Sequence, residues 1–177
     1  MINDKEFDAI FIIMDAAFPD CEMRTYTGQR ALCSNPFYQI IIKRDTSGRI
    51  IALLAVWEFS WFSFVEHIAV DSVIRGGGIG GKLLSEYLKQ CKKPIILEVE
   101  SPTNDITKNR VRFYNRLGFQ LNDFYYLQPP YREGYDYMEL NIMSYPYSIT
   151  ETEFAPFKEI IYKEVYHSST TSTRRLL

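Results

Sequence analysis

Cysteine and histidine are scarce in this 177-residue sequence. The three cysteines, Cys21, Cys33 and Cys91, include no closely spaced pair of the kind that binds zinc, and their odd number leaves one unpaired if a disulfide forms. The two histidines, His67 and His167, lie far apart, with no acidic or cysteine ligand pattern beside them. We therefore expect no metal site, no histidine-based catalytic triad, and a reducing, cytoplasmic environment.

The sequence also lacks a long apolar run and an excess of positive charge. Its apolar stretches near residues 40–42 and 51–56 are strand length, far short of the about 20 residues that cross a membrane, and the N-terminus has no signal-peptide plan. The net charge of −2, with no lysine-rich face, argues against nucleic acid as the main partner. Length and apolar fraction suit one soluble domain, and the sequence leaves open whether it forms a homodimer.

What the sequence does contain is a regular succession of apolar patterns, beginning with a helix. Asn3 and Glu6 form a capping box, and apolar residues follow at helical spacing until Pro19 ends the segment. A turn signal at residues 45–48 separates two apolar segments and predicts a β-hairpin. The other elements expected in this half are a helical segment at residues 26–34 and strands at residues 37–44, 49–59 and 64–70.

The second half of the sequence continues the alternation of strands and helices. Pro94 opens a strand, and Gly118 suits the left-handed cap of a helix. The elements expected here are helices at residues 83–91 and 106–117 and strands at residues 95–100, 124–128 and 137–143. Together the elements predict an α/β domain with a mixed, mostly antiparallel sheet flanked by helices, whose one central parallel pair is formed by the strands ending at Val70 and Glu100.

The character of the sequence changes after Pro146. Pro156 fits only the first turn of a helix, and apolar residues between 157 and 165 supply that helix with one buried face. Serine and threonine then dominate the end of the chain. We expect one main domain at residues 1–146, a C-terminal helical appendage at residues 147–167 and a flexible tail at residues 168–177.

The most informative stretch is the glycine-rich run at residues 75–82, which lies between an apolar strand and an amphipathic helix. Glycine allows positive φ and a close approach of the backbone to a bulky anion. A helix that begins there adds free N–H groups and the positive end of its dipole, and Arg75 can add a charge-assisted hydrogen bond. The run therefore predicts a phosphate-binding loop.

Other glycine patterns overlap this run. Its glycines satisfy the dinucleotide fingerprint, with Glu98 or Glu100 at a suitable separation for a ribose-binding acid. That fingerprint needs its first glycine almost directly after the strand, whereas five residues separate Val70 from Gly76. The run also imitates a nucleoside-triphosphate loop, but Leu83 stands where a Ser or Thr hydroxyl must bind magnesium.

A further pattern, Arg75-x-x-Gly78-x-Gly80 after a strand ending in Ala69-Val70-Asp71, resembles the acetyl-CoA pyrophosphate loop of the GNAT superfamily of acyltransferases. In that family a later helix ends in Phe-Tyr-x-x-Leu-Gly-Phe, and this chain has the same pattern at residues 113–119. Two independent motifs are much harder to obtain by chance than one glycine run. The resemblance covers about residues 1–146 and implies a single GNAT-like domain, an acyl-CoA N-acyltransferase.

The resemblance also implies which residues hold acetyl-CoA as co-substrate. The pantetheine arm is expected along the main chain of Ile68, Ala69 and Val70, where a backbone N–H polarises the thioester carbonyl. Many relatives carry an Asn seven residues before the motif tyrosine, where this chain has Thr107, and Asn109 is the nearby candidate for a cofactor contact. The implied pyrophosphate-binding residues are Arg75, Gly76, Gly77, Gly78, Ile79, Gly80, Gly81 and Lys82.

For the chemistry, the family's motif tyrosine often protonates the departing thiolate, so Tyr114 is the candidate general acid; alternatively, it merely packs beside Phe113. The candidate bases are Glu66, Glu98 and Glu100, because a carboxylate within a β-rich core is costly unless it is paired or functional. Strand alternation points His67 away from Glu66 and favours a structural role for it. The alternative partners for the three glutamates are Arg110, Arg112 and Arg116.

The acceptor is an amine on this interpretation. Tyrosines crowd the segment that in relatives approaches the acceptor, and with nearby acids they could form an aromatic, negative pocket for a cationic amine, or simply an amphipathic strand edge. No cysteine lies in a nucleophile setting, so direct transfer is favoured. A non-catalytic acyl-CoA-binding module and a dinucleotide-binding oxidoreductase are the alternatives. The tyrosines concerned are Tyr125, Tyr126, Tyr131, Tyr135 and Tyr137.

Overall fold

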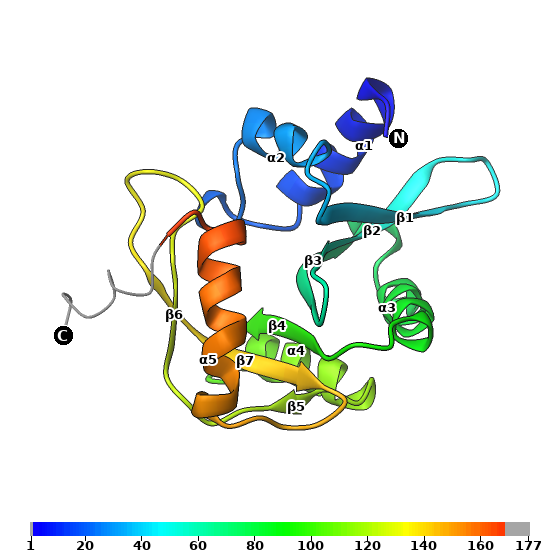
Figure 1. The fold of residues 1–177 in the computed structure, drawn as a ribbon. Coiled ribbons are helices and arrows are strands. Elements are labelled where there is room, and N and C mark those ends of the chain that lie inside the picture. The colour runs from blue at the N-terminus through cyan, green and yellow to red at the C-terminus, as the bar shows by residue number, and fades with distance from the viewer. Residues whose placement is uncertain (1, 169–177) are drawn as a thin grey trace. The chain divides into compact units, whose positions relative to one another are not determined.

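The computed structural model describes residues 2–168, and the chain divides into two compact units, Met1–Lys93 and Pro94–Leu177 (Figure 1). The tail predicted at residues 168–177 lies outside the described residues except for Ser168. Among the described residues, no helix combines the length and the apolar character needed to cross a membrane.

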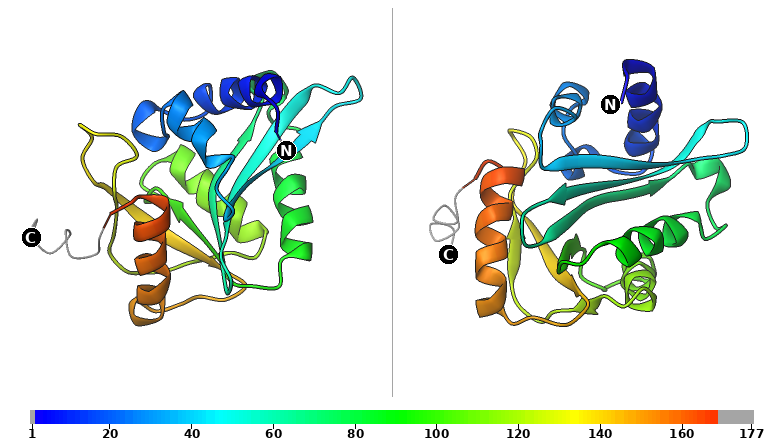
Figure 2. Two further views of the ribbon diagram at one scale, coloured as in Figure 1. Left: turned by 45° about the horizontal axis from the view of Figure 1, so that its top comes forward. Right: turned by 45° about the vertical axis from the view of Figure 1, so that its right-hand side comes forward.

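The first unit contains a three-stranded antiparallel sheet with helices on both faces (Figure 2). In chain order its elements are α1 (Asp4–Asp15), η1 (Asp20–Glu22), α2 (Tyr26–Leu32), β1 (Tyr38–Arg44), β2 (Ile50–Glu58), β3 (Ser63–Val70), η2 (Ser72–Ile74) and α3 (Ile79–Gln90). The predicted hairpin is confirmed, because β1 pairs with β2 and Gly48 N–H donates to the Asp45 carbonyl to close the turn. β2 is almost wholly buried, which explains its continuous apolar run.

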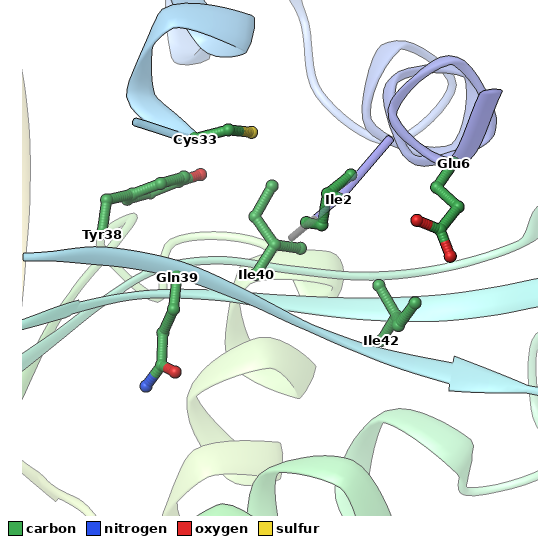
Figure 3. Close-up of a pocket in the computed structure, with 7 residues that line it drawn as sticks. All are labelled: Ile2, Glu6, Cys33, Tyr38, Gln39, Ile40 and Ile42. Carbon is green, nitrogen blue, oxygen red and sulfur yellow. The ribbon is translucent and has the colours of Figure 1, made fainter. Parts of the chain in front are cut away.

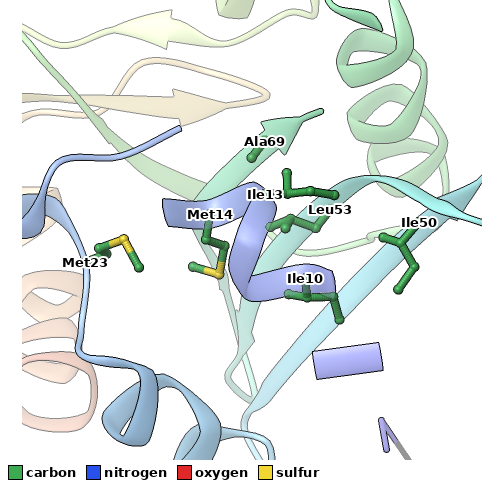
Figure 4. Packing of buried hydrophobic residues seen from close by; sticks show 7 residues of the cluster. All are labelled: Ile10, Ile13, Met14, Met23, Ile50, Leu53 and Ala69. Carbon is green, nitrogen blue, oxygen red and sulfur yellow. The ribbon is translucent and has the colours of Figure 1, made fainter. Parts of the chain in front are cut away.

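The helix α1 covers one face of this sheet. Its predicted capping box is confirmed, since the Asn3 side chain accepts from Glu6 N–H while the Glu6 carboxylate accepts from Asn3 N–H. Ile10 and Met14 on the buried side of the helix pack with Leu53 of β2 and Ala69 of β3 (Figure 4). This packing holds β3, the strand that leads into the glycine-rich run, against a rigid core.

The second unit is built around β7 (Met138–Tyr145). Its other elements are β4 (Ile95–Val99), α4 (Asp105–Arg116), β5 (Gln120–Leu121), β6 (Tyr126–Gln128), α5 (Glu151–Ile160) and the π-helical segment η3 (Ile161–Val165). β4, β5 and β6 all pair with β7 in antiparallel ladders. Gly118 follows α4 with φ of 96°, which confirms the predicted left-handed cap, whereas the short strand β5 was not predicted.

The position of Pro156 differs from the prediction. α5 begins at Glu151, because Thr150 and Glu153 form a capping box that fixes the helix start, and Pro156 therefore lies inside the helix rather than in its first turn. Its missing N–H costs one helical hydrogen bond. The helix nevertheless continues into η3, because Phe154, Phe157, Ile161 and Tyr162 are buried on one face and bury enough apolar surface to offset that loss.

Candidate functional site

The loop after β3 begins with a fixed turn. Asp71 accepts a hydrogen bond from Val73 N–H at 3.0 Å and caps the short helix η2, while its other oxygen is held by Arg49 at 2.8 Å. Arg75 folds back so that its Nε donates to the Val70 carbonyl at 3.2 Å. The end of β3 and the entrance to the glycine run are therefore fixed by side chains of the first unit.

Glycine supplies the backbone geometry of this loop. Gly76 has φ of 94° and Gly78 has φ of 70°, values that residues with a Cβ rarely adopt. Gly78 is also the N-cap of α3, so the first amide groups of that helix have no carbonyl partner within the helix. A Cβ on either glycine would meet no heavy atom within 4 Å, so the space above the loop is open. These features together form a place for an anion at a helix N-terminus.

A close approach of helix and strand accompanies the loop. A Cβ at Gly80 would lie 3.3 Å from Val70 Cγ2, so a larger residue there would push α3 away from β3. The helix η2 also separates the strand from the first glycine, and the strands of this unit are antiparallel. The dinucleotide fingerprint requires the opposite arrangement, with a glycine directly after a strand of a parallel sheet.

A β-bulge in β3 alters the predicted surroundings of Glu66. Ala55 lies opposite His67 and Val56 lies opposite Val65, so Glu66 is the extra residue of the bulge. The bulge turns Glu66 and His67 toward the same side, and the predicted opposite orientation is wrong. Glu66 Oε2 lies 3.5 Å from His67 Nδ1.

Both side chains face the segment between α1 and α2. Arg24 Nη1 donates to Glu66 Oε1 at 2.7 Å, His67 Nε2 lies 2.9 Å from the Glu22 carbonyl oxygen, and the His67 ring contacts Phe18. Burial alone would raise the pKa of the Glu66 carboxyl, but the charge of Arg24 and the adjacent His67 outweigh it and hold that pKa at about 2. Glu66 is thus a charged, fully buried carboxylate with a fixed partner.

The other two candidate bases, Glu98 and Glu100, have different partners. Glu100 forms an ion pair with Arg110 of α4, one of the arginines that the sequence suggested as an alternative partner. Glu98, on β4, is half-buried and accepts hydrogen bonds from two phenols, Tyr126 and Tyr166, the second at 2.5 Å. Two phenol hydroxyls therefore donate to Glu98, and an arginine pairs with Glu100.

Tyr114 is buried on α4 with its ring against Phe113 and Phe119, at centroid distances of 5.1 and 5.8 Å. Burial raises the pKa of its phenol to about 12, with Arg110 lowering it and Glu100 raising it by smaller amounts. Tyr114 consequently remains protonated throughout the neutral range.

The N-terminal cap of α4 explains why this chain has Thr107 at the position where many relatives carry Asn. Asn104 and Thr107 form a reciprocal cap, with Asn104 Oδ1 accepting from Thr107 N–H at 3.0 Å and Thr107 Oγ1 accepting from Asn104 N–H at 3.2 Å. Thr107 is thus committed to the cap. Asn109 lies exposed on the same helix and accepts from Arg112 at 3.2 Å.

The tyrosines of the predicted acceptor pocket separate into two sets. Tyr125 and Tyr135 are exposed, whereas Tyr126 and Tyr131 belong to a hydrogen-bonded group around Glu98. Tyr166 completes this group, with its hydroxyl 3.2 Å from that of Tyr131. Sequence reasoning did not single out Tyr166, although its position four residues after the buried Tyr162 continues the apolar stripe of the C-terminal helix.

The predicted residues therefore belong to two groups. The glycine-rich loop, residues 68–70 and Glu66 lie in the first unit, and Tyr114, Glu98, Glu100 and Asn109 lie in the second. An open pocket of about 370 Å³ also lies in the first unit, lined in part by Ile40 and Ile42 of β1 and by Cys33 (Figure 3). None of the predicted site residues lines that pocket.

A glycine loop joins a bulged strand to a helix N-terminus in an α/β protein. The sequence profile of the Acetyltransferase (GNAT) family matches residues 5–119, and the chain belongs to that family. This match confirms the expected resemblance.

Individual relatives agree with the family match. YjbC of Bacillus subtilis (strain 168) is 38% identical over 105 residues, which cover 58% of this chain and 52% of YjbC, so the chain spans about half the length of that relative. A GNAT-family protein of Bacteroides thetaiotaomicron superimposes with a TM-score of 0.84 at 29% identity, covering 92% of both chains. This superposition confirms the predicted α/β GNAT fold.

A more distant structure shares the fold. It is the GNAT superfamily phosphinothricin acetyltransferase of Sinorhizobium meliloti, solved in complex with AcCoA, with a TM-score of 0.58 and 17% identity, covering 82% of this chain and 85% of the other.

Proposed function

We propose that the chain transfers the acetyl group of acetyl-CoA directly to a primary amine of a small molecule or peptide. The observation that carries this proposal is the loop of residues 75–82, where two positive-φ glycines and the free amides of α3 surround open space in a member of the GNAT family. The distant relative from Sinorhizobium meliloti binds AcCoA in the same fold, which supports acetyl-CoA as the co-substrate.

The loop and strand hold the acyl donor on this proposal. Amides of residues 76–82 and the side chain of Arg75 bind the pyrophosphate, Arg75 exchanging its bond to the Val70 carbonyl for one to a phosphate oxygen. The main chain of residues 68–70 binds the pantetheine arm, and Asn109 remains a proposed contact. Acetyl-CoA itself supplies an activated acetyl thioester.

Tyr114 serves as the general acid. Its raised pKa keeps the phenol protonated, which is the form that a departing thiolate requires. As the bond between carbon and sulfur breaks, the phenol gives its proton to sulfur and regains one from the protons released by the acceptor nitrogen.

Glu98 is the base that the contacts favour among the three proposed glutamates. Glu66 is tied to Arg24 with a pKa of about 2, so it holds a proton poorly, and Glu100 is paired with Arg110. Glu98 is bonded to phenols and has the capacity to accept a proton from the ammonium form of the acceptor. The neutral amine then attacks the thioester carbonyl, and Glu98 returns its proton to solvent.

A thermal-shift comparison with acetyl-CoA, CoA, NAD and ATP at equal concentrations tests the co-substrate. A ligand about a hundredfold above its dissociation constant stabilises a protein by about 2.7 kcal/mol, which gives a clear rise in Tm. We expect a rise with the two CoA compounds only. A rise with NAD or ATP alone would contradict the proposal and return the glycine run to one of the competing patterns.

Turnover separates an enzyme from a binding module. Release of free thiol from acetyl-CoA, dependent on an added amine, supports catalysis, whereas a rise in Tm without thiol release for any amine identifies an acyl-CoA-binding module. The cytoplasmic location, a homodimer, and the boundaries at residues 146 and 167 stay predictions.

A further inference from the structure

The segment between β3 and the glycine-rich loop of residues 75–82 has little packing to hold it, because the residues of η2 are exposed or half-buried. Asp71 supplies polar contacts instead. Its N–H donates to the Ile51 carbonyl of β2 at 2.9 Å, and its Oδ1 accepts from Val73 N–H at 3.0 Å. Its carbonyl accepts from Ile74 N–H at 3.1 Å. The direction in which the chain leaves β3 therefore depends on how Asp71 is held.

Arg49, in the β1–β2 hairpin, holds the other oxygen of that carboxylate. Its Nη1 lies 2.8 Å from Asp71 Oδ2, and its Nε lies 3.4 Å from Asp45 Oδ2 at the start of the hairpin turn. Asp45 is itself fixed, because its Oδ1 accepts from the Ser47 hydroxyl at 2.6 Å, from Ser47 N–H at 2.9 Å and from Arg49 N–H at 3.1 Å. These hydrogen bonds, that of the Ser47 hydroxyl first, lower the pKa of the Asp45 carboxyl to about 2. Arg49 is therefore held between two carboxylates.

Arg49 also places a positive charge beside a carboxylate at the entrance to a proposed anion site. The Asp71 side chain is only 17% exposed, and a carboxylate so close to the loop repels a bound pyrophosphate unless a cation compensates it. The Arg49 side chain is 51% exposed, so the ion pair contributes little to the stability of the whole fold. Its main effect is therefore expected on the loop and on the ligand bound there.

We propose that Arg49 is a positioning residue for the glycine-rich loop: it holds the Asp71 carboxylate, and through Asp71 it fixes η2 and the backbone that presents the loop amides to a pyrophosphate. This inference rests on the proposed binding of acetyl-CoA at residues 75–82. Arg49 lies in neither of the two motifs that carry the family resemblance. The β1–β2 hairpin thus contributes to the affinity for the acyl donor, although it supplies no direct contact to that donor on this proposal.

Calorimetric titration with acetyl-CoA tests this role. Arg49→Gln should raise the dissociation constant about fivefold, because the ion pair that it removes is partly exposed. Arg44→Gln is the matched control, since it removes the same charge from the same hairpin, where Arg44 pairs with Glu6 and donates to the Gly48 carbonyl. The difference between the two variants should shrink between about 0.05 M and about 1 M salt, because salt screens partly exposed charges.

A double-mutant cycle determines whether Arg49 acts through Asp71. Asp71→Asn keeps a side-chain oxygen that can cap η2 and removes the negative charge. In that background Arg49→Gln should weaken binding less than it does in the wild type, because the charge of its partner is gone. An equally large effect in both backgrounds would overturn the positioning role. Arg49→Lys keeps the charge and should recover part of the affinity.

Steady-state kinetics separate this role from a general loss of structure. The KM for acetyl-CoA should rise about fivefold in Arg49→Gln relative to Arg44→Gln, while the KM for the amine stays unchanged. Phenethylamine, spermidine and a peptide with a free N-terminal alanine serve as acceptors. A parallel rise of both KM values would indicate a general loss of structure and contradict the inference.

Hydrogen exchange of the protein without ligand tests the same contact independently of the proposed function. The Val73 and Ile74 amides donate to Asp71, so they should exchange faster in Arg49→Gln than in Arg44→Gln. Equal exchange rates in the two variants, or equal dissociation constants in a protein that binds acetyl-CoA, would overturn the inference. If the wild type binds no acetyl-CoA, the proposed function fails, and faster exchange in Arg49→Gln still supports Arg49 as the residue that holds this segment.

Discussion

At the scale of single residues, the proposed chemistry depends on a phenol that stays protonated. Tyr114→Phe removes the hydroxyl and keeps the ring contacts with Phe113 and Phe119. Because a positioned general acid contributes about a hundredfold or more, we expect kcat to fall about a hundredfold while the KM for acetyl-CoA changes little. Steady-state kinetics against the exposed Tyr125→Phe control measure this effect. Equal kcat in the two variants would remove Tyr114 from the mechanism.

Single substitutions also test which glutamate serves as the general base. Glu98→Gln keeps the shape of the side chain and removes its ability to take a proton, so we expect a fall in kcat of about a hundredfold. Glu100→Gln loses only a partly exposed ion pair with Arg110, so a much smaller change is expected. Steady-state kinetics compare the two variants. A larger loss of kcat in Glu100→Gln than in Glu98→Gln would reverse the assignment of the base.

At the scale of elements, the glycine loop makes a sharp prediction. Gly78→Val places a β-branched residue at φ of 70°, where it is strained, and blocks the backbone approach to the pyrophosphate, so acetyl-CoA binding should be lost. Gly48→Val is the matched control, because Gly48 has φ of 87° in the hairpin turn and also has open space around it.

Calorimetric titration with acetyl-CoA compares the two glycine variants. Both should lose some stability from backbone strain, and only Gly78→Val should lose binding. Tight binding by Gly78→Val would show that the loop does not hold the pyrophosphate.

Elements defined by local signals were predictable from the sequence. The capping box at Asn3, the hairpin turn before Gly48 and the left-handed cap at Gly118 each depend on residues a few positions apart, and each is confirmed. Pro156 was placed wrongly because the stronger start signal, Thr150 with Glu153, fixes the helix earlier in the sequence.

The orientation of His67 and the partners of Glu66 could not be predicted from the alternation of side chains between the two faces of a strand. A single extra residue in β3 reverses the side on which later side chains lie, and the register slip that reveals it depends on pairing with β2. Tyr166 was missed for a similar reason, because Glu98 lies 68 residues away in the chain. The motifs identified the family, whereas the partners of the candidate glutamates depend on contacts between distant segments.

At the scale of the whole molecule, the buried Arg24–Glu66 pair links folding stability to pH. The folded-state pKa of Glu66 is about 2, below the ordinary value of 4.5, so its contribution is fully present above pH 4.5 and is lost as pH falls toward 2. Glu66→Gln leaves the Arg24 charge buried without its carboxylate and should cost about 3 kcal/mol at neutral pH.

Urea unfolding near neutral pH and near about pH 3 tests this link. The stability difference between wild type and Glu66→Gln should shrink at the lower pH, because Glu66 of the unfolded chain is then protonated, and folding must remove that proton to form the charged pair. Glu100→Gln is the comparison, since its ion pair is partly exposed and screened. A difference for Glu66→Gln that stays constant with pH would contradict the assigned pKa.

The most direct test of the central claim is acetyl transfer itself. Purified protein is incubated with acetyl-CoA and the three amines, thiol release is followed, and the amine products are weighed by mass spectrometry. We predict amine-dependent thiol release and a product heavier than the amine by one acetyl group. Thiol release without acetylated amine, or no release with any amine, would contradict a direct N-acetyltransferase.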